Sequence, residues 1–195
     1  MLRRGSTLET EIKLPLGDAA STRRELARLG FSIVKRRVFE INTIFDTPGG
    51  VLRRERKLLR LRQAGRRHTL AFKGSPLAGK RHKSREELES EFANPVAMRR
   101  ILEGLGYRPV FRYEKYRTEY SQPDHIGSAM LDQTPIGDFL ELEGPPRWID
   151  RTARSLGRRP ADYITASYGS LYLEHCKAAG IEPTGMIFAG KRQRS

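Results

Sequence analysis

Charged and apolar residues alternate along many short segments of this chain, and this pattern restricts its fold more than any other feature. The segment 9–13, with the sequence Glu-Thr-Glu-Ile-Lys, is the first example. In a strand it would place two carboxylates and an ammonium on one face, because successive side chains point to opposite sides. Like charges on one face repel unless a positive charge lies between them. The segment therefore predicts either a strand face turned to solvent or a site for a divalent cation beside an anion such as phosphate.

The same alternation recurs along the rest of the chain, with acidic and basic positions grouped separately. A single strand whose charges share one face normally turns that face to water. Repetition over many strands instead favours charged faces that converge inside a barrel, with helices over the apolar outer faces. Such an interior needs a charged ligand and a metal to compensate the burial of its charges. The positions that share a face are Arg60 with Arg62; Thr69 and Ala71 with Lys73; Arg85, Glu87 and Glu89 with Glu91; Lys115 with Arg117; and Phe139 and Glu141 with Glu143.

These segments predict an α+β fold built on an eight-stranded antiparallel closed β-barrel, with helices packed outside. About eight strands is the number at which a closed barrel becomes wide enough to hold side chains or one small ligand. Proline, glycine and helix-capping residues separate the elements. The expected strands are 8–14, 31–45, 57–63, 68–73, 85–92, 109–120, 126–132 and 139–143, and the expected helices are 18–29, 94–105, 150–156 and 163–179.

Length and charge indicate one domain over residues 1–195, with a basic tail at about 190–195. The chain has 37 basic and 23 acidic side chains, and the resulting charge of +14 favours anionic partners. The basic residues are spread over many strands, and we expect no helix with a dense basic stripe, so a nucleic acid is not expected as a specific partner. A small polyanion bound inside the fold would account for much of the excess.

The single cysteine, Cys176, excludes an intrachain disulfide and fits a reducing compartment. The N-terminus has no apolar stretch typical of a signal peptide, and no run of apolar residues reaches the length of a membrane span. We therefore expect a cytoplasmic protein without a membrane partner.

Taken in order, the motifs of this chain resemble those of the CYTH superfamily, the triphosphate tunnel metalloenzymes. That group includes thiamine triphosphatases, inorganic triphosphatases and class IV adenylyl cyclases. The resemblance covers nearly the whole chain, and it rests on the ordered succession of motifs that are each short. The motifs are Glu9-x-Glu11-x-Lys13, Phe45-Asp46-Thr47-Pro48, Leu59 to Arg62, Thr69 to Gly74, Arg85-x-Glu87-x-Glu89, Lys115-x-Arg117, Leu131-Asp132, Gly137-x-Phe139-x-Glu141-x-Glu143, and Ser167 to Leu171.

Four glutamates are the predicted metal ligands. A triphosphate is a dense anion, so its binding needs Arg and Lys side chains and a hard cation that bridges its oxygens. Glu9 and Glu11 are predicted to hold that cation, with Glu141 and Glu143 facing them across the tunnel, and the resemblance implies the same assignment. Oxygen ligands favour Mg²⁺ or Mn²⁺ over zinc. Asp132 is predicted as a catalytic residue that holds a second metal or orients a water.

Basic side chains are predicted to bind the phosphate groups. Arg60 and Arg62 can each bind phosphoryl oxygens through two parallel hydrogen bonds. Lys73 is also the candidate base for the attacking water, on the expectation that neighbouring cations favour its neutral form. Glu87 and Glu89 are predicted to hold the arginines in place or to contribute to the second metal. The other predicted phosphate-binding residues are Lys13, Arg85, Lys115 and Arg117.

The predicted activity is metal-dependent hydrolysis of an inorganic or organic triphosphate, with release of phosphate. One alternative is a class IV adenylyl cyclase, in which the ribose 3′-hydroxyl of ATP would attack the α-phosphate and displace pyrophosphate. We find no clear base-reading motif, and this favours the hydrolase. The other alternative is a non-enzymatic module that binds polyphosphate or RNA, which would leave the carboxylates without a role. The organic group, the number of metals and the oligomeric state stay open, although the resemblance implies that a homodimer is common among relatives.

Overall fold

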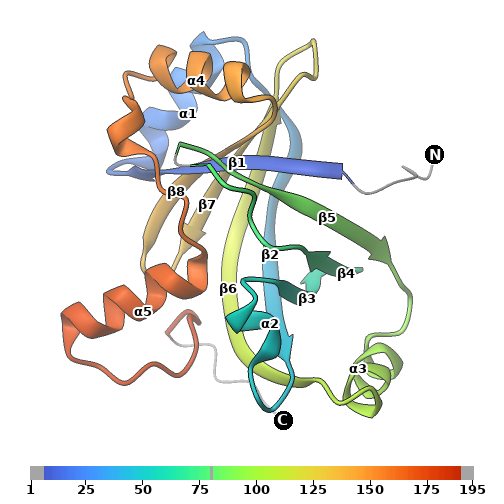
Figure 1. Ribbon diagram of the computed structural model, residues 1–195. Coiled ribbons are helices and arrows are strands. Elements are labelled where there is room, and N and C mark those ends of the chain that lie inside the picture. Colours follow the sequence, from blue (N-terminus) through green and yellow to red (C-terminus); the bar gives the residue numbers. More distant parts are fainter. Residues whose placement is uncertain (1–6, 80, 190–195) are drawn as a thin grey trace.

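The computed structural model describes residues 7–79 and 81–189, so the expected basic tail at 190–195 lies outside the described residues. Its eight strands form a closed barrel in the order β1-β5-β4-β3-β2-β6-β7-β8, and every neighbouring pair is antiparallel (Figure 1). This confirms the predicted architecture. The strands are β1 (Thr7–Leu16), β2 (Ser32–Asp46), β3 (Leu58–Ala64), β4 (Arg67–Lys73), β5 (Lys83–Glu91), β6 (Arg108–Ser121), β7 (Ser128–Thr134) and β8 (Gly137–Glu143).

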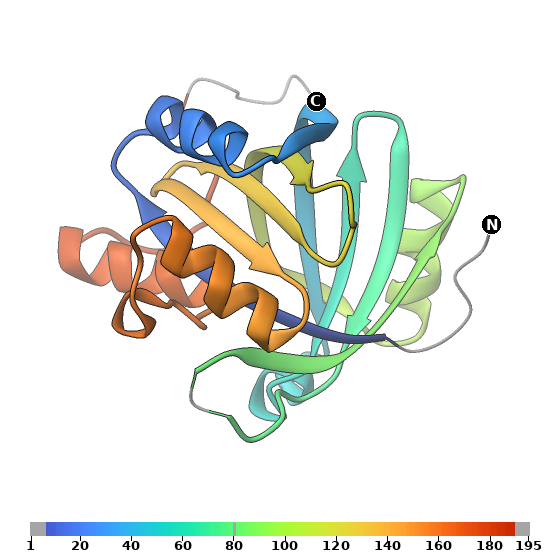
Figure 2. The same cartoon turned by 90° about the horizontal axis from the view of Figure 1, so that it is seen from above.

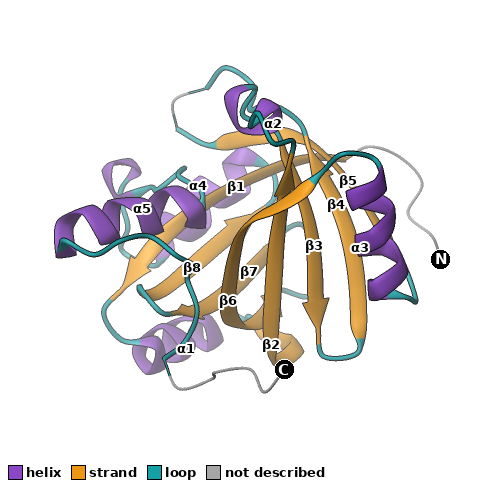
Figure 3. Ribbon diagram, turned by 90° about the horizontal axis from the view of Figure 1, so that it is seen from below, coloured by secondary structure: helices purple, strands orange, loops and turns teal. Residues whose placement is uncertain are grey.

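Helices lie on the outside of the barrel (Figure 2 and Figure 3). Among the described residues, none of them is long and apolar enough to cross a membrane. They are α1 (Ala19–Arg28), α2 (Val51–Arg54), α3 (Pro95–Gly104), α4 (Pro146–Ser155) and α5 (Tyr168–Ala179), with a 3₁₀ turn at Pro160–Asp162.

The apolar core lies between the barrel and its helices. Ile12 and Leu14 on the outer face of β1 pack in one cluster with Leu26 of α1 and Trp148 of α4. A second cluster places Cys176 of α5 against β6 and β8, and a third lies under α2 and α3. Each fully buried aliphatic side chain contributes about 1.5–3 kcal/mol of hydrophobic free energy. Because the first and third clusters satisfy the outer faces of the strands, the inner faces are free to carry charge, as the alternation predicts. In the second cluster, Tyr113 has the inward parity of Lys115 and lines the tunnel.

Two helix boundaries differ from the sequence-based prediction. α4 begins at Pro146 rather than at residue 150, because proline lacks an N–H and is tolerated in the first turn of a helix. The expected helix 163–179 begins only at Tyr168, with Ser167 as its N-cap. The chain just before that cap is extended, since Ile164 and Lys13 exchange two backbone hydrogen bonds. This segment therefore adds a short bridge to β1 beside the inner residue Lys13.

Asp46 shapes the turn after β2, as the sequence predicts. Its carboxylate accepts hydrogen bonds from the backbone N–H groups of Thr47 at 2.7 Å and of Leu52 and Arg53 at 2.9 Å. N–H groups in the first turn of a helix have no partner within the helix, so this carboxylate satisfies two of them. The short helix α2 has no counterpart in the prediction, because it depends on this contact rather than on a periodic pattern.

Gly127, between β6 and β7, lies against the ring of Trp148. A Cβ atom added there would lie 2.5 Å from Cε3 of Trp148, which is far inside van der Waals contact. Because Trp148 belongs to the core under α4, we expect Gly127→Ala to lower the free energy of unfolding by about 1–3 kcal/mol through overpacking. Urea denaturation followed by far-UV circular dichroism measures the change.

Gly104, the last residue of α3, provides a matched control for Gly127. A Cβ at this position would meet nothing within 4 Å. Alanine favours a helix over glycine by about 0.5–1 kcal/mol, so Gly104→Ala is expected to leave stability unchanged or to raise it. Equal stabilities of the two variants would show that the Gly127 contact is not tight.

Candidate active site

Four carboxylates lie on the inner face of β1 and β8. The antiparallel register pairs Glu11 with Glu143 and Lys13 with Glu141, and Glu9 lies at the next inward position of β1. Glu9, Glu11 and Glu141 are buried, and Glu143 is half-buried. Nζ of Lys13 lies 3.3 Å from Glu11 Oε1 and 3.4 Å from Glu141 Oε1. The structure thus places the four glutamates that the sequence predicts as metal ligands on the inner face of two neighbouring strands, with a lysine between two of them.

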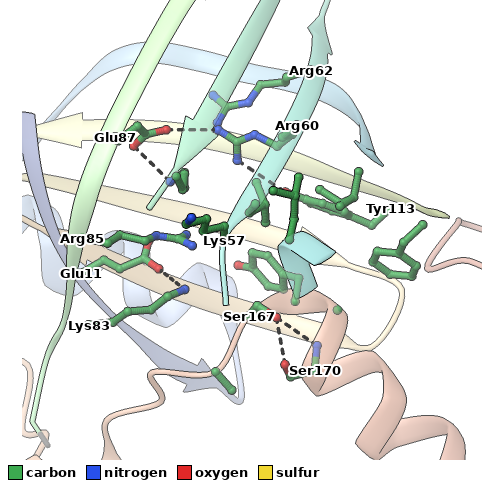
Figure 4. A pocket seen from close by; sticks show the side chains of 18 of the residues that line it. Glu11, Lys57, Arg60, Arg62, Lys83, Arg85, Glu87, Tyr113, Ser167 and Ser170 are labelled. Atoms are coloured by element: carbon green, nitrogen blue, oxygen red, sulfur yellow. Dashed lines mark hydrogen bonds and ion pairs between the residues drawn. The ribbon is translucent and has the colours of Figure 1, made fainter. Parts of the chain in front are cut away.

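The predicted phosphate-binding side chains point into the same tunnel from other strands. Figure 4 shows Arg60 and Arg62 of β3 and Arg85 of β5 around this space, with Glu11 of β1 bound to Lys83 of β5. The tunnel has a volume of about 1480 Å³, which exceeds the roughly 300–1,000 Å³ of common small-molecule pockets. It therefore has room for an extended anion. The basic wall consists of Lys13, Arg60, Arg62, Lys73, Arg85, Lys115 and Arg117, and all but the half-buried Arg62 are buried.

Glu87 and Glu89 of β5 contact the arginines of β3, as the sequence predicts for supporting residues. Arg60 Nη2 lies 3.6 Å from an oxygen of each carboxylate, and Arg62 Nη2 lies 4.0 Å from Glu89. Arg60 also donates a hydrogen bond to the hydroxyl of Tyr113 (Figure 4). Among the described residues, Arg60 Nε, Arg60 Nη2 and Arg62 Nε have no hydrogen-bond partner, so these donors are available to an anion in the tunnel.

Lys73 of β4 lies between two carboxylates. Its Nζ is 2.6 and 2.7 Å from the two carboxylate oxygens of Glu9 and 3.0 Å from Glu87 Oε2. Its contacts are therefore anionic, whereas the prediction of a water-activating base assumes neighbouring cations. In this arrangement Lys73 links β4 to β1 and β5, and its role as a base stays a prediction.

Asp132 of β7 is fully buried behind the basic wall. Its carboxylate accepts hydrogen bonds from Lys115 Nζ at 2.8 Å, from Arg117 Nε at 2.6 Å and from the hydroxyl of Tyr168 at 2.8 Å. Both oxygens are thus occupied by donors, and Asp132 does not line the tunnel. The structure places Asp132 as a positioning residue for Lys115 and Arg117. This arrangement gives no support to the predicted role of Asp132 as a metal ligand or catalytic residue.

Three further residues of the site were given no role in it by the sequence analysis. Glu40 of β2 is fully buried, and neither carboxylate oxygen has a hydrogen-bond partner among the described residues. Burial raises the pKa of Glu40, but Lys115 and Arg117 outweigh it and lower that pKa to about 2. Lys83 contacts Glu11 at 3.0 Å, and the Tyr168 hydroxyl contacts Asp132. A signal existed for two of them, since Glu40 and Lys83 have the inward parity of their strands.

Glu9 and Glu11 of β1 and Glu141 and Glu143 of β8, which we call the glutamate edge of the tunnel, repel one another. Burial and the negative charge of Glu9 raise the pKa of Glu143 to about 7. Burial and Glu11 likewise raise the pKa of Glu9, although Lys73 opposes them. Glu141 behaves differently: burial raises its pKa, but Arg117 and Lys115 hold it well below the usual range. The edge that contains Glu143 therefore has less positive charge around it than the rest of the tunnel.

A hard divalent cation fits this edge by the chemistry of its donors. All the candidate ligands are carboxylate oxygens, which Mg²⁺ and Mn²⁺ prefer, and the raised pKa of Glu143 marks a place where added positive charge is favourable. Within residues 7–79 and 81–189, no three His, Cys, Asp or Glu side chains are already gathered in a geometry that could hold a metal. Glu9 and Glu11 are engaged by Lys73 and Lys83, so a bound cation would compete with these ammonium groups.

Glu143→Gln provides a test of this electrostatic imbalance. A carboxylate whose pKa is raised by folding destabilises the folded state once pH exceeds its unfolded value, and the loss is complete above the folded pKa of about 7. We expect the variant to be more stable than the parent by about 1–3 kcal/mol at pH 8 in EDTA, and equal to it near pH 4. Urea denaturation at several pH values measures the difference. A difference that does not change with pH would contradict the assignment.

The fold and the site define a member of a family of tunnel enzymes. The sequence model of the CYTH domain matches residues 7–167, and the chain belongs to the CYTH family. Members of this family are enzymes that act on triphosphates, as adenylyl cyclases or as triphosphatases.

Individual relatives agree with this assignment. A protein of Methanocaldococcus jannaschii named "Putative adenylate cyclase" is 32% identical over 136 residues, which cover 70% of this chain and 76% of that protein. A structure from Vibrio parahaemolyticus, also described as a putative adenylate cyclase, has a TM-score of 0.73 at 19% identity, covering 86% of this chain and 98% of that one. A Hippeastrum structure, described as a putative adenylyl cyclase with a dominant triphosphatase activity, has a TM-score of 0.63 at 19% identity, covering 90% and 97%. These two structures share the fold of this chain.

Proposed function

We propose that this chain is a metal-dependent triphosphatase, which binds an inorganic or organic triphosphate inside the barrel and releases its terminal phosphate. The observation that carries the proposal is the division of the buried tunnel into a basic wall and an edge of four glutamates. Buried charges of one sign are unfavourable unless a partner compensates them. Many of these charges pair with one another, but among the described residues Arg60 Nε, Arg60 Nη2 and Arg62 Nε have no hydrogen-bond partner. A triphosphate would supply acceptors for these donors, and a divalent cation would offset the repulsion around Glu143.

The residues of the basic wall would bind and orient the substrate. Arg60 and Arg62 from β3 and Arg117 from β6 suit phosphoryl oxygens, because a guanidinium donates two parallel hydrogen bonds. A water oxygen would attack the terminal phosphorus, the bond from that phosphorus to its bridging oxygen would break, and the water proton would pass to a base, for which Lys73 is the candidate. Orthophosphate and the shortened chain would leave. Catalysis of this kind depends on positioning and on charge neutralisation.

Mg²⁺ or Mn²⁺ is the cofactor that the site suits. Glu9, Glu11, Glu141 and Glu143 would hold it, and when bound it supplies neutralisation of the phosphate charge. Lys13 lies between Glu11 and Glu141, so it would keep those carboxylates in place and could also contact a phosphate oxygen. The shared fold of the Hippeastrum protein, which is described with a dominant triphosphatase activity, supports hydrolysis as the proposed reaction.

A class IV adenylyl cyclase is the second candidate, favoured by the name of the 32% identical relative. The same basic wall and metal would serve both reactions. The two reactions differ in the nucleophile, which is water in one and the ribose 3′-hydroxyl in the other. They also differ in the phosphorus attacked, so the products separate them.

The double variant Glu9→Gln/Glu11→Gln tests whether the tunnel is a catalytic site or only a binding site. Changes at outer-shell partners of metal ligands already alter activity about 10–100-fold, so the loss here should exceed about 100-fold. We therefore expect orthophosphate release from tripolyphosphate with Mn²⁺ to collapse, while calorimetric binding of tripolyphosphate in EDTA is retained. Unchanged release of orthophosphate would mean that Glu9 and Glu11 take no part in catalysis. Binding of tripolyphosphate without any turnover by the parent protein would support a non-enzymatic binding module.

A further inference from the structure

The charge surplus of this protein does not come from its tunnel. Apart from two ion pairs, Arg67–Glu91 and Lys35–Glu119, the inward-facing charged residues of the barrel strands are eight basic and eight acidic side chains, so their formal charges nearly cancel. Nearly all of the surplus of +14 therefore belongs to other residues of the chain, which corrects the expectation that an internal polyanion accounts for much of it. The inward set is Lys13, Arg60, Arg62, Lys73, Lys83, Arg85, Lys115 and Arg117 with Glu9, Glu11, Glu40, Glu87, Glu89, Asp132, Glu141 and Glu143.

Part of that surplus is concentrated on the outer face of α4. Arg147, Arg151 and Arg154 are exposed and spaced by four and three residues, which places them on one face of the helix. The opposite face carries Trp148 and Ile149, which are buried against the barrel. Contrary to the sequence-based expectation, one helix of the protein therefore carries a basic stripe. We call Arg147, Arg151 and Arg154 the α4 arginine face.

The charges of the α4 arginine face are not neutralised by the protein. Among the described residues, none of the three guanidiniums has an ion-pair partner within 4.0 Å. Asp150 is the single acidic residue of the helix, and its carboxylate is engaged by His82 at 2.9 Å, Tyr163 at 3.1 Å and Arg81 at 3.5 Å. Like charges three and four residues apart destabilise a helix, and Arg147 also faces the positive end of the helix dipole. The three arginines therefore destabilise the helix, and their charge suits the binding of an anion from outside the protein.

We propose that the α4 arginine face binds the phosphodiester backbone of a nucleic acid duplex, without sequence preference. Three arginines over two helical turns span about 10 Å, and a duplex offers one negative charge per about 1.7 Å of its axis. A membrane surface fits less well, because the apolar residues of α4 point into the core and leave nothing to insert between lipids. The site is separate from the tunnel, so the proposal does not depend on the reaction that the tunnel carries out.

Fluorescence anisotropy with a labelled 20-base-pair DNA duplex, from 50 to 200 mM KCl, tests the proposal. Each phosphate contact contributes about 0.9 to the slope of log K against log salt concentration. We expect Arg151→Gln/Arg154→Gln to lower that slope by about 2 and the affinity at 50 mM KCl by more than tenfold. Hydrolysis of tripolyphosphate, if the parent protein shows it, should be unchanged, and circular dichroism checks that the variant is folded.

The matched control is Arg99→Gln/Arg100→Gln on α3, which removes the same charge from exposed residues. α3 and α4 lie on opposite sides of the barrel in each ribbon view (Figure 1, Figure 2 and Figure 3). We expect this control to change the slope by less than 0.5. Equal effects of the two variants would show that only net charge matters. Absence of duplex binding in the parent protein, or binding to phosphatidylserine vesicles in its place, would overturn the proposal.

Discussion

Replacing Asp132 with alanine is expected to lower the free energy of unfolding by about 3–5 kcal/mol. Removal of one charge from a buried ion-pair network leaves the opposite buried charges uncompensated. Asp132 is fully buried and accepts hydrogen bonds from Lys115, Arg117 and Tyr168. Without the carboxylate, the two buried cations would keep, among the described residues, only Glu40 and Glu141 as counter-charges. Urea denaturation at pH 7 measures the loss.

Two variants separate the charge of Asp132 from its other contributions. Tyr168→Phe removes a single hydrogen bond to Asp132 and keeps the ring, so we expect a loss of about 0.5–1.5 kcal/mol. Asp132→Asn keeps the shape but not the charge, and it should approach the alanine variant. If Asp132→Ala cost less than about 1 kcal/mol, the carboxylate would not hold the basic wall, and a metal or catalytic role for Asp132 would regain support.

Replacing Lys73 with arginine is expected to lower kcat for tripolyphosphate hydrolysis by about 10²–10⁴-fold if Lys73 is the base, because arginine keeps the charge but cannot release a proton. Lys73 is buried between Glu9 and Glu87, and the glutamates are the groups that a metal would draw away from it. Steady-state kinetics with Mn²⁺ over a range of pH measures the effect on kcat and KM.

The alanine variant at the same position distinguishes a base from a phosphate ligand. Lys73→Ala removes both functions, so we expect kcat to fall as in the arginine variant and KM to rise as well. If Lys73→Arg kept kcat within a fewfold of the parent protein, Lys73 would bind phosphate through its charge alone. The base would then have to be another group of the tunnel.

The sequence predicts the inner and outer faces of the barrel well because strand geometry has a fixed period of two. Glu9 and Glu11 lie inside and Ile12 lies in the core, as the alternation requires. A slip of one residue would have reversed every such assignment, so the agreement extends to the orientation of each strand. The ordered motifs also located charged residues that meet in the tunnel, from the six strands β1, β3, β4, β5, β6 and β8.

The pairing of those charges could not be predicted from the sequence. Asp132 has the same residue type and inward parity as a metal ligand would have, yet the register of β6 with β7 places it opposite Arg117. Lys73 was expected among cations, but it lies opposite Glu87 in the β4–β5 register. Cross-strand neighbours depend on which strands are adjacent and by how many residues they are shifted, and neither quantity is encoded in a single segment.

A count of residues could not show where in the structure the surplus positive charge lies. The sequence shows 37 basic side chains, but only the barrel shows that those inside are nearly balanced by acids. The stripe on α4 escaped notice because the predicted helix began at residue 150, four residues late, and so excluded Arg147. Helix ends are set by local capping and proline geometry, and an error of one turn there can hide a pattern.

The measurement that tests the central claim most directly is product analysis by phosphorus NMR. The purified protein would be given tripolyphosphate, thiamine triphosphate and ATP in turn, each with Mg²⁺ or Mn²⁺. A triphosphatase predicts orthophosphate from tripolyphosphate, with ATP a poor substrate or cut only at its γ-phosphate. Pyrophosphate and cyclic AMP from ATP would contradict that account and would make the protein an adenylyl cyclase.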